Sequence, residues 1–124
     1  MKQIISTPNA PQAIGPYSQA VEANGFVFVS GQIPIVPATG QMPEGIEAQT
    51  EQVMRNIGAI LEAAGLTYSN VVKTTVLLKS IADFATMNGI YAKYFTADCP
   101  ARAAFAVKEL PKKALVEIEM IAAK

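Results

Sequence analysis

Histidine and tryptophan are absent from this chain of 124 residues, and cysteine occurs only once, at Cys99. Without histidine a His-based catalytic triad is impossible, and zinc sites built on imidazole are excluded. A single cysteine excludes an intramolecular disulfide and a thiolate-rich metal site, and it fits a reducing compartment. Acid–base chemistry therefore falls to carboxylate, tyrosine, lysine or water, and we expect no metal.

Charge is also scarce, because charged residues make up 16% of the chain against a usual share of about 25%. Ten Lys and Arg balance ten Asp and Glu, so neither nucleic acid nor an anionic membrane is attracted by net charge. Hydrophobic residues reach 51%. This composition predicts that part of the surface is buried in a homo-oligomer, the alternative being a monomer with an apolar surface.

Long apolar runs are missing as well. No stretch approaches the roughly 18 consecutive apolar residues of a membrane span. The segment Met1–Pro8 lacks the apolar core of a signal peptide, so we expect a cytoplasmic protein. The length predicts one domain over residues 1–124.

What is present predicts an α+β fold. Asn24-Gly25 is a hairpin signal between two strand-like runs, and apolar residues recur at helical spacing before Gly65. The order of elements predicts a split β-α-β arrangement, a mixed sheet with two helices on one face. The uncovered face is where we expect the oligomer interface. The expected strands are 4–5, 17–23, 26–30, 71–79, 103–108 and 114–122, and the expected helices are 46–64 and 83–95.

Arg102 is one of two arginines, and it lies in an otherwise apolar run from Cys99 to Val107. A guanidinium in such a run must reach water or face a partner. Its planar fork suits a carboxylate, either of a small metabolite or of Glu117 or Glu119 in an internal salt bridge. By period-two alternation the two glutamates share one strand face with Leu115 and Ile121.

Four separated stretches carry a resemblance to a known family. They are Ala13-Ile14-Gly15-Pro16-Tyr17-Ser18-Gln19, Ser30-Gly31-Gln32-Ile33-Pro34, Phe84-Ala85-Thr86-Met87-Asn88, and Pro100-Ala101-Arg102 followed by Val116-Glu117-Ile118-Glu119. With these motifs in this order, the chain resembles the RidA family, also called YjgF, from about Ile4 to Ala122.

The resemblance implies a chorismate-mutase-like fold and a homotrimer with active sites in clefts between neighbouring subunits. It also implies hydrolysis of enamines and imines, such as 2-aminoacrylate and 2-iminobutanoate, to 2-keto acids and ammonia without a metal or organic cofactor. A non-enzymatic trimer that binds a 2-keto acid as a regulator, or acts like a chaperone, is the alternative. In the family the matching arginine binds the substrate carboxylate, so Arg102 is expected to do so.

The resemblance assigns roles to further positions. Glu117 is expected to hold the attacking water, and the phenol of Tyr17 to bond that water or the substrate amine. Asn88 is expected on the apolar face of its helix, lining the cleft or bonded to backbone within the fold. Ser30 and Gly31 suit a small pocket, although an ordinary strand end also explains them.

Ala104 stands where family members often have a cysteine two residues after the arginine. This departure argues against an essential thiol, and backbone groups at Ala104 remain available to contact the substrate. Cys99 has no histidine partner, so it is not a candidate nucleophile.

Overall fold

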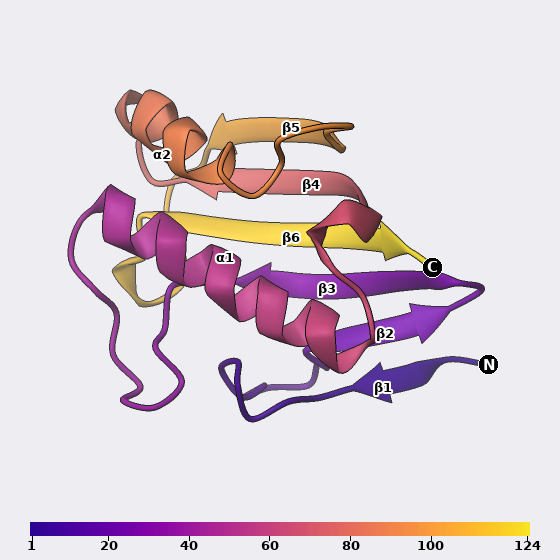
Figure 1. Ribbon diagram of the computed structural model, residues 1–124. Coiled ribbons are helices and arrows are strands. Elements are labelled where there is room, and N and C mark those ends of the chain that lie inside the picture. Colours follow the sequence, from indigo (N-terminus) through magenta and orange to yellow (C-terminus); the bar gives the residue numbers. More distant parts are fainter.

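Six strands form one mixed sheet in the computed structural model, which describes residues 1–124 (Figure 1). Across the sheet the strand order is β1-β2-β3-β6-β4-β5. Strands β4 and β5 run parallel, whereas all other neighbouring pairs are antiparallel. The strands are β1 Gln3–Ile5, β2 Ala20–Ala23, β3 Phe26–Gln32, β4 Val71–Leu78, β5 Ala101–Ala106 and β6 Val116–Ala123.

Two helices, α1 (Ile46–Ala63) and α2 (Phe84–Tyr91), lie against one face of this sheet (Figure 1). Helix α2 belongs to the crossover that parallel pairing of β4 and β5 requires. The predicted α+β arrangement of a mixed sheet with both helices on one face is therefore confirmed. Short 3₁₀ helices occupy Tyr68–Asn70 and Ile81–Asp83, whereas Pro111–Lys113 forms a turn in which Lys112 and Lys113 have positive φ. No helix combines the length and apolar character needed to cross a membrane.

The core lies between the helices and the sheet. On β6, Val116, Ile118, Met120 and Ala122 are buried toward the helices and join one cluster with the apolar stripe of α1. Alternation leaves Glu117, Glu119 and Ile121 on the other face. The sequence predicted that the two glutamates share one strand face with Ile121, and the structure confirms it. Leu115, which was expected to share the strand with them, lies just before β6 begins.

No element of the chain covers the second face of the sheet. Phe26 and Phe28 on β3 are 42% and 45% exposed, and Phe105 on β5 is 48% exposed. The register aligns Phe28 with Ile121, and it aligns Leu77 with both Glu117 and Phe105, so these side chains share that face. The predicted uncovered, partly apolar sheet face is present, and its burial in an oligomer stays a prediction.

Several predicted boundaries are wrong. Strand β2 begins at Ala20, because the Tyr17 N–H donates to the Gly15 carbonyl oxygen at 2.8 Å in a tight turn that precedes the strand. Helix α2 ends at Tyr91, after which 3₁₀-type bonds tighten the chain, as from the Tyr94 N–H to the Tyr91 carbonyl. Strand β5 begins at Ala101, which places Arg102 inside a strand.

Ser30 and Gly31 do not end their strand as predicted. They lie within β3, at an irregularity in its pairing with β6 between Val29 and Gln32. Such a bulge changes the direction in which side chains project, and bulges are common beside functional sites.

Candidate active site in two halves

Glu117 lies in a hollow of about 330 Å³ that opens near the start of β6. Its walls come from the segment before β2, the end of β3, the loop that follows β3 and the turn before β6. Besides Glu117, the lining residues are Pro11, Gln12, Ile14, Tyr17, Gly31, Gln32, Ile33, Ile35, Pro111 and Lys112. Apolar walls interrupted by a few polar groups, here the Glu117 carboxyl, the Tyr17 phenol, the Lys112 amine and two glutamine amides, are typical of a small-molecule site.

The backbone of Gly31 approaches the carboxyl of Glu117 closely. A Cβ atom added at Gly31 would collide with the Glu117 Oε2 atom and would lie 3.0 Å from its Cδ atom. A larger residue at position 31 would therefore have to displace the Glu117 carboxyl. Burial raises the pKa of the Glu117 carboxyl above its ordinary value, and the charge of Glu119 raises it further. A carboxyl tuned in this way suits proton transfer nearer to neutral pH.

Tyr17 lines this hollow and is 51% exposed. The segment that carries Tyr17 is held by two polar residues, the half-buried Ser30 and the buried Gln19. The Ser30 hydroxyl donates to the Ser18 carbonyl oxygen at 2.5 Å, and the Ser30 N–H donates to the Gln19 carbonyl oxygen at 2.9 Å. The predicted pocket residue Ser30 thus anchors the Tyr17 segment, because its hydroxyl proton is already engaged there.

Gln19 organises the opposite wall from a buried position, 3% exposed. Its Oε1 atom accepts the Thr7 N–H at 2.7 Å, and its Nε2 group donates to carbonyl oxygens of Thr7 (3.1 Å), Ala10 (3.3 Å) and Pro11 (2.8 Å). These bonds fix the extended segment that brings Pro11 to the hollow. A buried amide with every partner satisfied is a rigid support.

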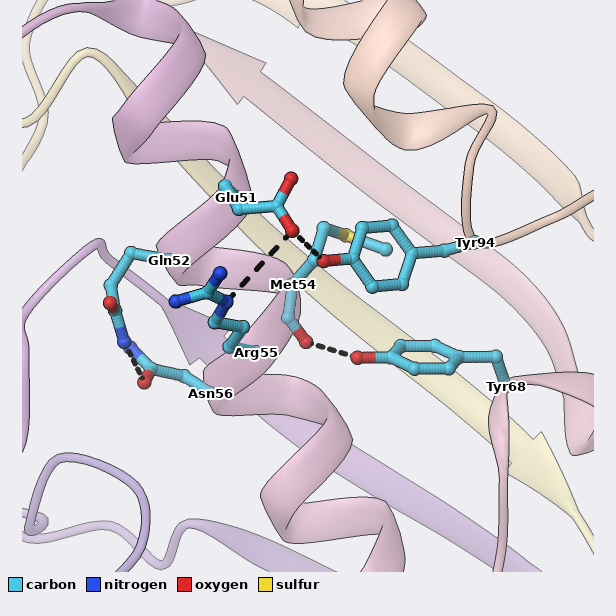
Figure 2. A network of polar contacts seen from close by, with 7 residues as sticks. All are labelled: Glu51, Gln52, Met54, Arg55, Asn56, Tyr68 and Tyr94. Atoms are coloured by element: carbon cyan, nitrogen blue, oxygen red, sulfur yellow. Dashed lines mark hydrogen bonds and ion pairs between the residues drawn. The ribbon is translucent and has the colours of Figure 1, made fainter.

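Helix α1 fixes the remaining wall. The Asn56 Nδ2 group donates to the carbonyl oxygens of Ile33 at 3.3 Å and Ile35 at 2.9 Å, and the Gln52 Nε2 group donates to Asn56 Oδ1 at 2.9 Å (Figure 2). The Gln49 Oε1 atom accepts the Leu115 N–H at 2.8 Å, two residues before Glu117. Polar residues on a buried helix face therefore hold the loop and strand that carry the site.

A second polar cluster joins α1 to the segments beyond it (Figure 2). The Tyr94 hydroxyl donates to Glu51 on α1, and the Tyr68 hydroxyl donates to the Met54 carbonyl oxygen at 2.5 Å. Burial, with the bond to Glu51, raises the pKa of the Tyr94 phenol to about 12. The two rings pack 4.9 Å apart between centroids, so this cluster braces the helix layer.

Arg102 lies in a different hollow, of about 450 Å³, beside α2. Its Nη1 group donates to the Asn88 Oδ1 atom at 2.7 Å, and its Cζ atom lies 4.8 Å from the centroid of the Tyr91 ring and 5.4 Å from that of Phe84. The internal salt bridge to Glu117 or Glu119 does not form. Five N–H donors belong to a guanidinium, so the fork keeps donors for a ligand carboxylate.

Within one chain the structure does not bring Arg102 and Glu117 together. Arg102 is in register with Thr74, which is buried toward the helices, whereas Glu117 is in register with Leu77 on the uncovered face. Ala104 follows Arg102 by two residues on β5 and so faces the same way as Arg102. The candidate residues thus form two groups on opposite faces of the sheet, with Tyr17, Ser30, Gly31 and Glu117 in one and Asn88, Arg102 and Ala104 in the other.

The predicted position of Asn88 is partly right. It shares a helix face with Phe84 and Tyr91, but it is only half-buried, and its amide oxygen accepts from a side chain and not from backbone. Cys99 borders the same hollow and is exposed, its Sγ atom 3.6 Å from the Phe95 carbonyl oxygen. No three His, Cys, Asp or Glu residues are grouped so that they could hold a metal ion.

Sequence reasoning missed the supporting residues. Gln19, Gln49 and Asn56 are polar positions that turn out to be buried, and only their place beside apolar residues at helix or strand spacing hinted at this. The contact of the Phe84 and Tyr91 rings with Arg102 was also missed, because it depends on the pairing of β4 with β5.

Comparison with known proteins places these observations in a family. A family model described as Endoribonuclease L-PSP matches residues 7–124, nearly the whole chain. The chain belongs to the RidA/YjgF family. The resemblance carried by the four sequence motifs is thereby confirmed.

Individual members of the RidA/YjgF family are similar over almost the whole chain. The chain is 54% identical over 122 residues to Reactive Intermediate Deaminase A, chloroplastic, of Arabidopsis thaliana, covering 98% of this chain and 65% of that protein. It is 52% identical over 123 residues to 2-iminobutanoate/2-iminopropanoate deaminase of Bos taurus, covering 98% and 90%. A crystal structure of E. coli TdcF with bound serine superposes with a TM-score of 0.95 at 42% identity, covering 98% of each chain.

Proposed function

We propose that this protein is a 2-iminobutanoate/2-iminopropanoate deaminase, which hydrolyses reactive enamines and imines such as 2-aminoacrylate and 2-iminobutanoate to 2-keto acids and ammonia. The proposal rests on sequence identity: over nearly its whole length the chain is 54% and 52% identical to two relatives that are named as deaminases of this kind. The chain also presents the two groups that the chemistry needs, an arginine fork with donors to spare and a half-buried carboxyl.

The two groups would meet in a homotrimer with sites between subunits. Arg102 and Glu117 lie on opposite faces of one sheet, so one copy alone does not form a complete site. The uncovered face, with Phe28 and Phe105 exposed, supplies apolar area for assembly. Arg102 and Asn88 of one subunit would then face the hollow of Tyr17, Gly31 and Glu117 in its neighbour.

The reaction proceeds through addition of water and loss of ammonia. An enamine first gains a proton on carbon from solvent and becomes the protonated imine. Arg102 binds the substrate carboxylate, and Glu117 and Tyr17 hold a water molecule beside the imine carbon. The water oxygen bonds to that carbon, the C=N π electrons move to the nitrogen, and Glu117 accepts the water proton and passes it to the nitrogen. The tetrahedral carbinolamine then breaks its C–N bond while its hydroxyl loses a proton to solvent, which releases ammonia and leaves the 2-keto acid.

Three other functions compete with this proposal. The family model carries the description of an endoribonuclease, yet a chain of zero net charge with two arginines offers no basic stripe to bind RNA. A 2-keto-acid sensor would use the same arginine but would bind without turnover. A chaperone-like trimer would use its apolar surface and would be indifferent to replacement of Arg102.

A coupled assay distinguishes these functions. A threonine/serine dehydratase generates the imine, semicarbazide traps the remaining imine, and release of 2-keto acid is followed with and without this protein. We expect acceleration that Arg102→Ala abolishes and Glu117→Gln reduces mainly through kcat. Full activity in the arginine variant overturns the mechanism, and tight keto-acid binding without acceleration favours the sensor. Prior dialysis against a metal chelator should leave the rate unchanged.

Mixing two inactive variants tests the site between subunits. Arg102→Ala and Glu117→Gln chains that exchange in a trimer should recreate intact sites, about one quarter of all sites at equal amounts and random assembly. Activity that stays at the level of the separate variants contradicts the proposed location. We also expect the protein in the cytoplasm, which cell fractionation checks.

A further inference from the structure

The guanidinium of Arg102 is held by three residues of α2. Phe84, Asn88 and Tyr91 are spaced by four and three residues, so they share one face of the helix. The rings of Phe84 and Tyr91 lie within 5.4 Å and 4.8 Å of the Arg102 Cζ atom, and Asn88 accepts its Nη1 N–H at 2.7 Å. Both ring distances are within the range of cation–π attraction.

Tyr91 is itself fixed from behind. Its hydroxyl shares a hydrogen bond of 2.8 Å with the Thr74 hydroxyl, and the two residues are only 6% and 0% exposed. Thr74 is the residue of β4 in register with Arg102 on β5, so the bond attaches the ring to the adjacent strand at the level of the arginine. The Phe95 ring packs 4.8 Å away between centroids. Tyr91 therefore cannot tilt without breaking a buried hydrogen bond.

We propose that Tyr91, locked by Thr74, is a positioning residue that holds the guanidinium of Arg102 in its carboxylate-binding orientation before substrate arrives. The inference rests on the proposed function for its kinetic consequence, though not for the geometry. A long flexible side chain that is already ordered loses less freedom when its ligand binds. Tyr91 would therefore act on substrate affinity through Arg102, without itself touching the reacting carbon.

The kinetic test separates KM from kcat. Tyr91→Leu removes the ring and should raise KM by about 3- to 30-fold, from the lost cation–π contact and the freedom returned to the arginine, with kcat little changed. Tyr91→Phe and Thr74→Val each remove one end of the same hydrogen bond. We expect similar, smaller rises in KM, and the double variant should add little to either.

Tyr94→Phe is the matched control. It also removes one tyrosine hydroxyl in the helix layer, but that hydroxyl bonds Glu51 and not the support of Arg102 (Figure 2). Its KM should stay at the value of the unmodified protein. Inhibition by 2-oxobutanoate and by its amide adds a second readout, because a loosened arginine weakens only the carboxylate inhibitor. Equal weakening of both inhibitors indicates general disruption and overturns the inference.

A ¹⁵N NMR experiment on the arginine side chains tests the same inference without requiring turnover. The chain has two arginines, so a ¹⁵N spectrum of arginine Nε–H groups holds two signals, and Arg102→Lys assigns them. Arg55 is the internal reference, because its side chain is 68% exposed. We expect the Arg102 signal to be shifted by the aromatic rings and to move toward the Arg55 position in Tyr91→Leu, since Phe84 and Asn88 still contact the guanidinium. An Arg102 signal that Tyr91→Leu leaves in place refutes the inference, whereas absence of turnover in the unmodified protein refutes only the proposed function.

Discussion

Adding a single methyl group at Gly31 should disable the proposed catalysis while leaving the fold intact. Gly31 does not adopt a positive φ, so alanine fits its backbone without strain. The new Cβ atom would nevertheless collide with the Glu117 carboxyl group. Gly31→Ala therefore tests, with the smallest possible change, whether the position of that carboxyl matters.

The structure sets the size of the displacement. The added Cβ would lie 3.0 Å from the Glu117 Cδ atom, and ordinary contact begins at 3.4 Å, so this carbon must retreat by at least 0.4 Å. The Oε2 atom lies closer and must move by about 1 Å, a misplacement that can cost on the order of 10²-fold in rate. The glutamate is the end of a flexible side chain, so the free energy of unfolding should fall by less than about 1 kcal/mol.

The dehydratase-coupled assay measures this effect, and urea denaturation measures the stability. We expect kcat of Gly31→Ala to fall by about 10²-fold, while KM changes little because Arg102 lies in the other half of the site. Gly89→Ala is the control, since a Cβ at that position of α2 meets nothing within 4 Å. That variant should keep its kcat and gain up to about 1 kcal/mol of stability.

Combination with Glu117→Gln makes the test specific. Once the proposed catalytic carboxyl is absent, Gly31→Ala should cause almost no further loss, since both changes act through one group. A kcat for Gly31→Ala within about threefold of the unmodified value would refute the reasoning, because the required displacement of Glu117 would then have no consequence for the reaction.

Three further predictions concern stability and assembly. Because the folded-state pKa of Glu117 is raised above 4.5, its stabilising contribution is complete below that value and is lost as pH rises through the raised pKa. The unfolding free energy of Glu117→Gln should therefore improve relative to the unmodified protein as pH rises through this window in urea titrations, and a constant difference contradicts this. Gln19→Leu leaves buried backbone groups without hydrogen-bond partners, so it should lower the free energy of unfolding by roughly 2–3 kcal/mol in the same urea titrations. The control Gln12→Leu changes an exposed residue and should cost under about 0.5 kcal/mol. Equal losses in the two variants would contradict the supporting role of Gln19. Phe28→Asp introduces a charge on the uncovered sheet face, so it should reduce the mass of the assembly measured by analytical ultracentrifugation. The control Thr86→Asp introduces a charge on the exposed surface of α2 and should leave that mass unchanged. An unchanged mass in Phe28→Asp argues against an interface on the uncovered face.

The sheet and helix layers followed from the sequence because their signals are local. Alternation along β6 and the apolar stripe of α1 each reflect one buried face, and both are found where they were expected. Boundaries were less predictable. The segment from Tyr17 to Gln19 reads as strand by composition, but the hydrogen bond from the Tyr17 N–H to the Gly15 carbonyl oxygen closes a turn there. The end of α2 depends on packing of Tyr94 against α1, which no local pattern reveals.

The residues of the site followed from the motifs, but their arrangement did not. Arg102 and Glu117 are fifteen positions apart, and the family resemblance assigns both to substrate binding and catalysis. Their separation depends on which sheet face each strand presents at its register, a property set by long-range pairing of β4 with both β5 and β6. The supports Gln19, Asn56 and Tyr91 act through bonds to distant segments, for which a single sequence holds no direct signal.

The turn before β6 contains backbone strain that lowers the stability of the folded protein. Lys112 and Lys113 follow Pro111 with φ values of 54° and 61°, a left-handed conformation that costs a non-glycine residue roughly 1–2 kcal/mol. Lys112 borders the hollow of Glu117, so the strained backbone forms part of its rim. Selection for heat tolerance would be expected to reach this turn early, through asparagine or glycine. If lysines were retained there under such selection, the rim would contribute more to substrate binding than its strain costs in thermal stability.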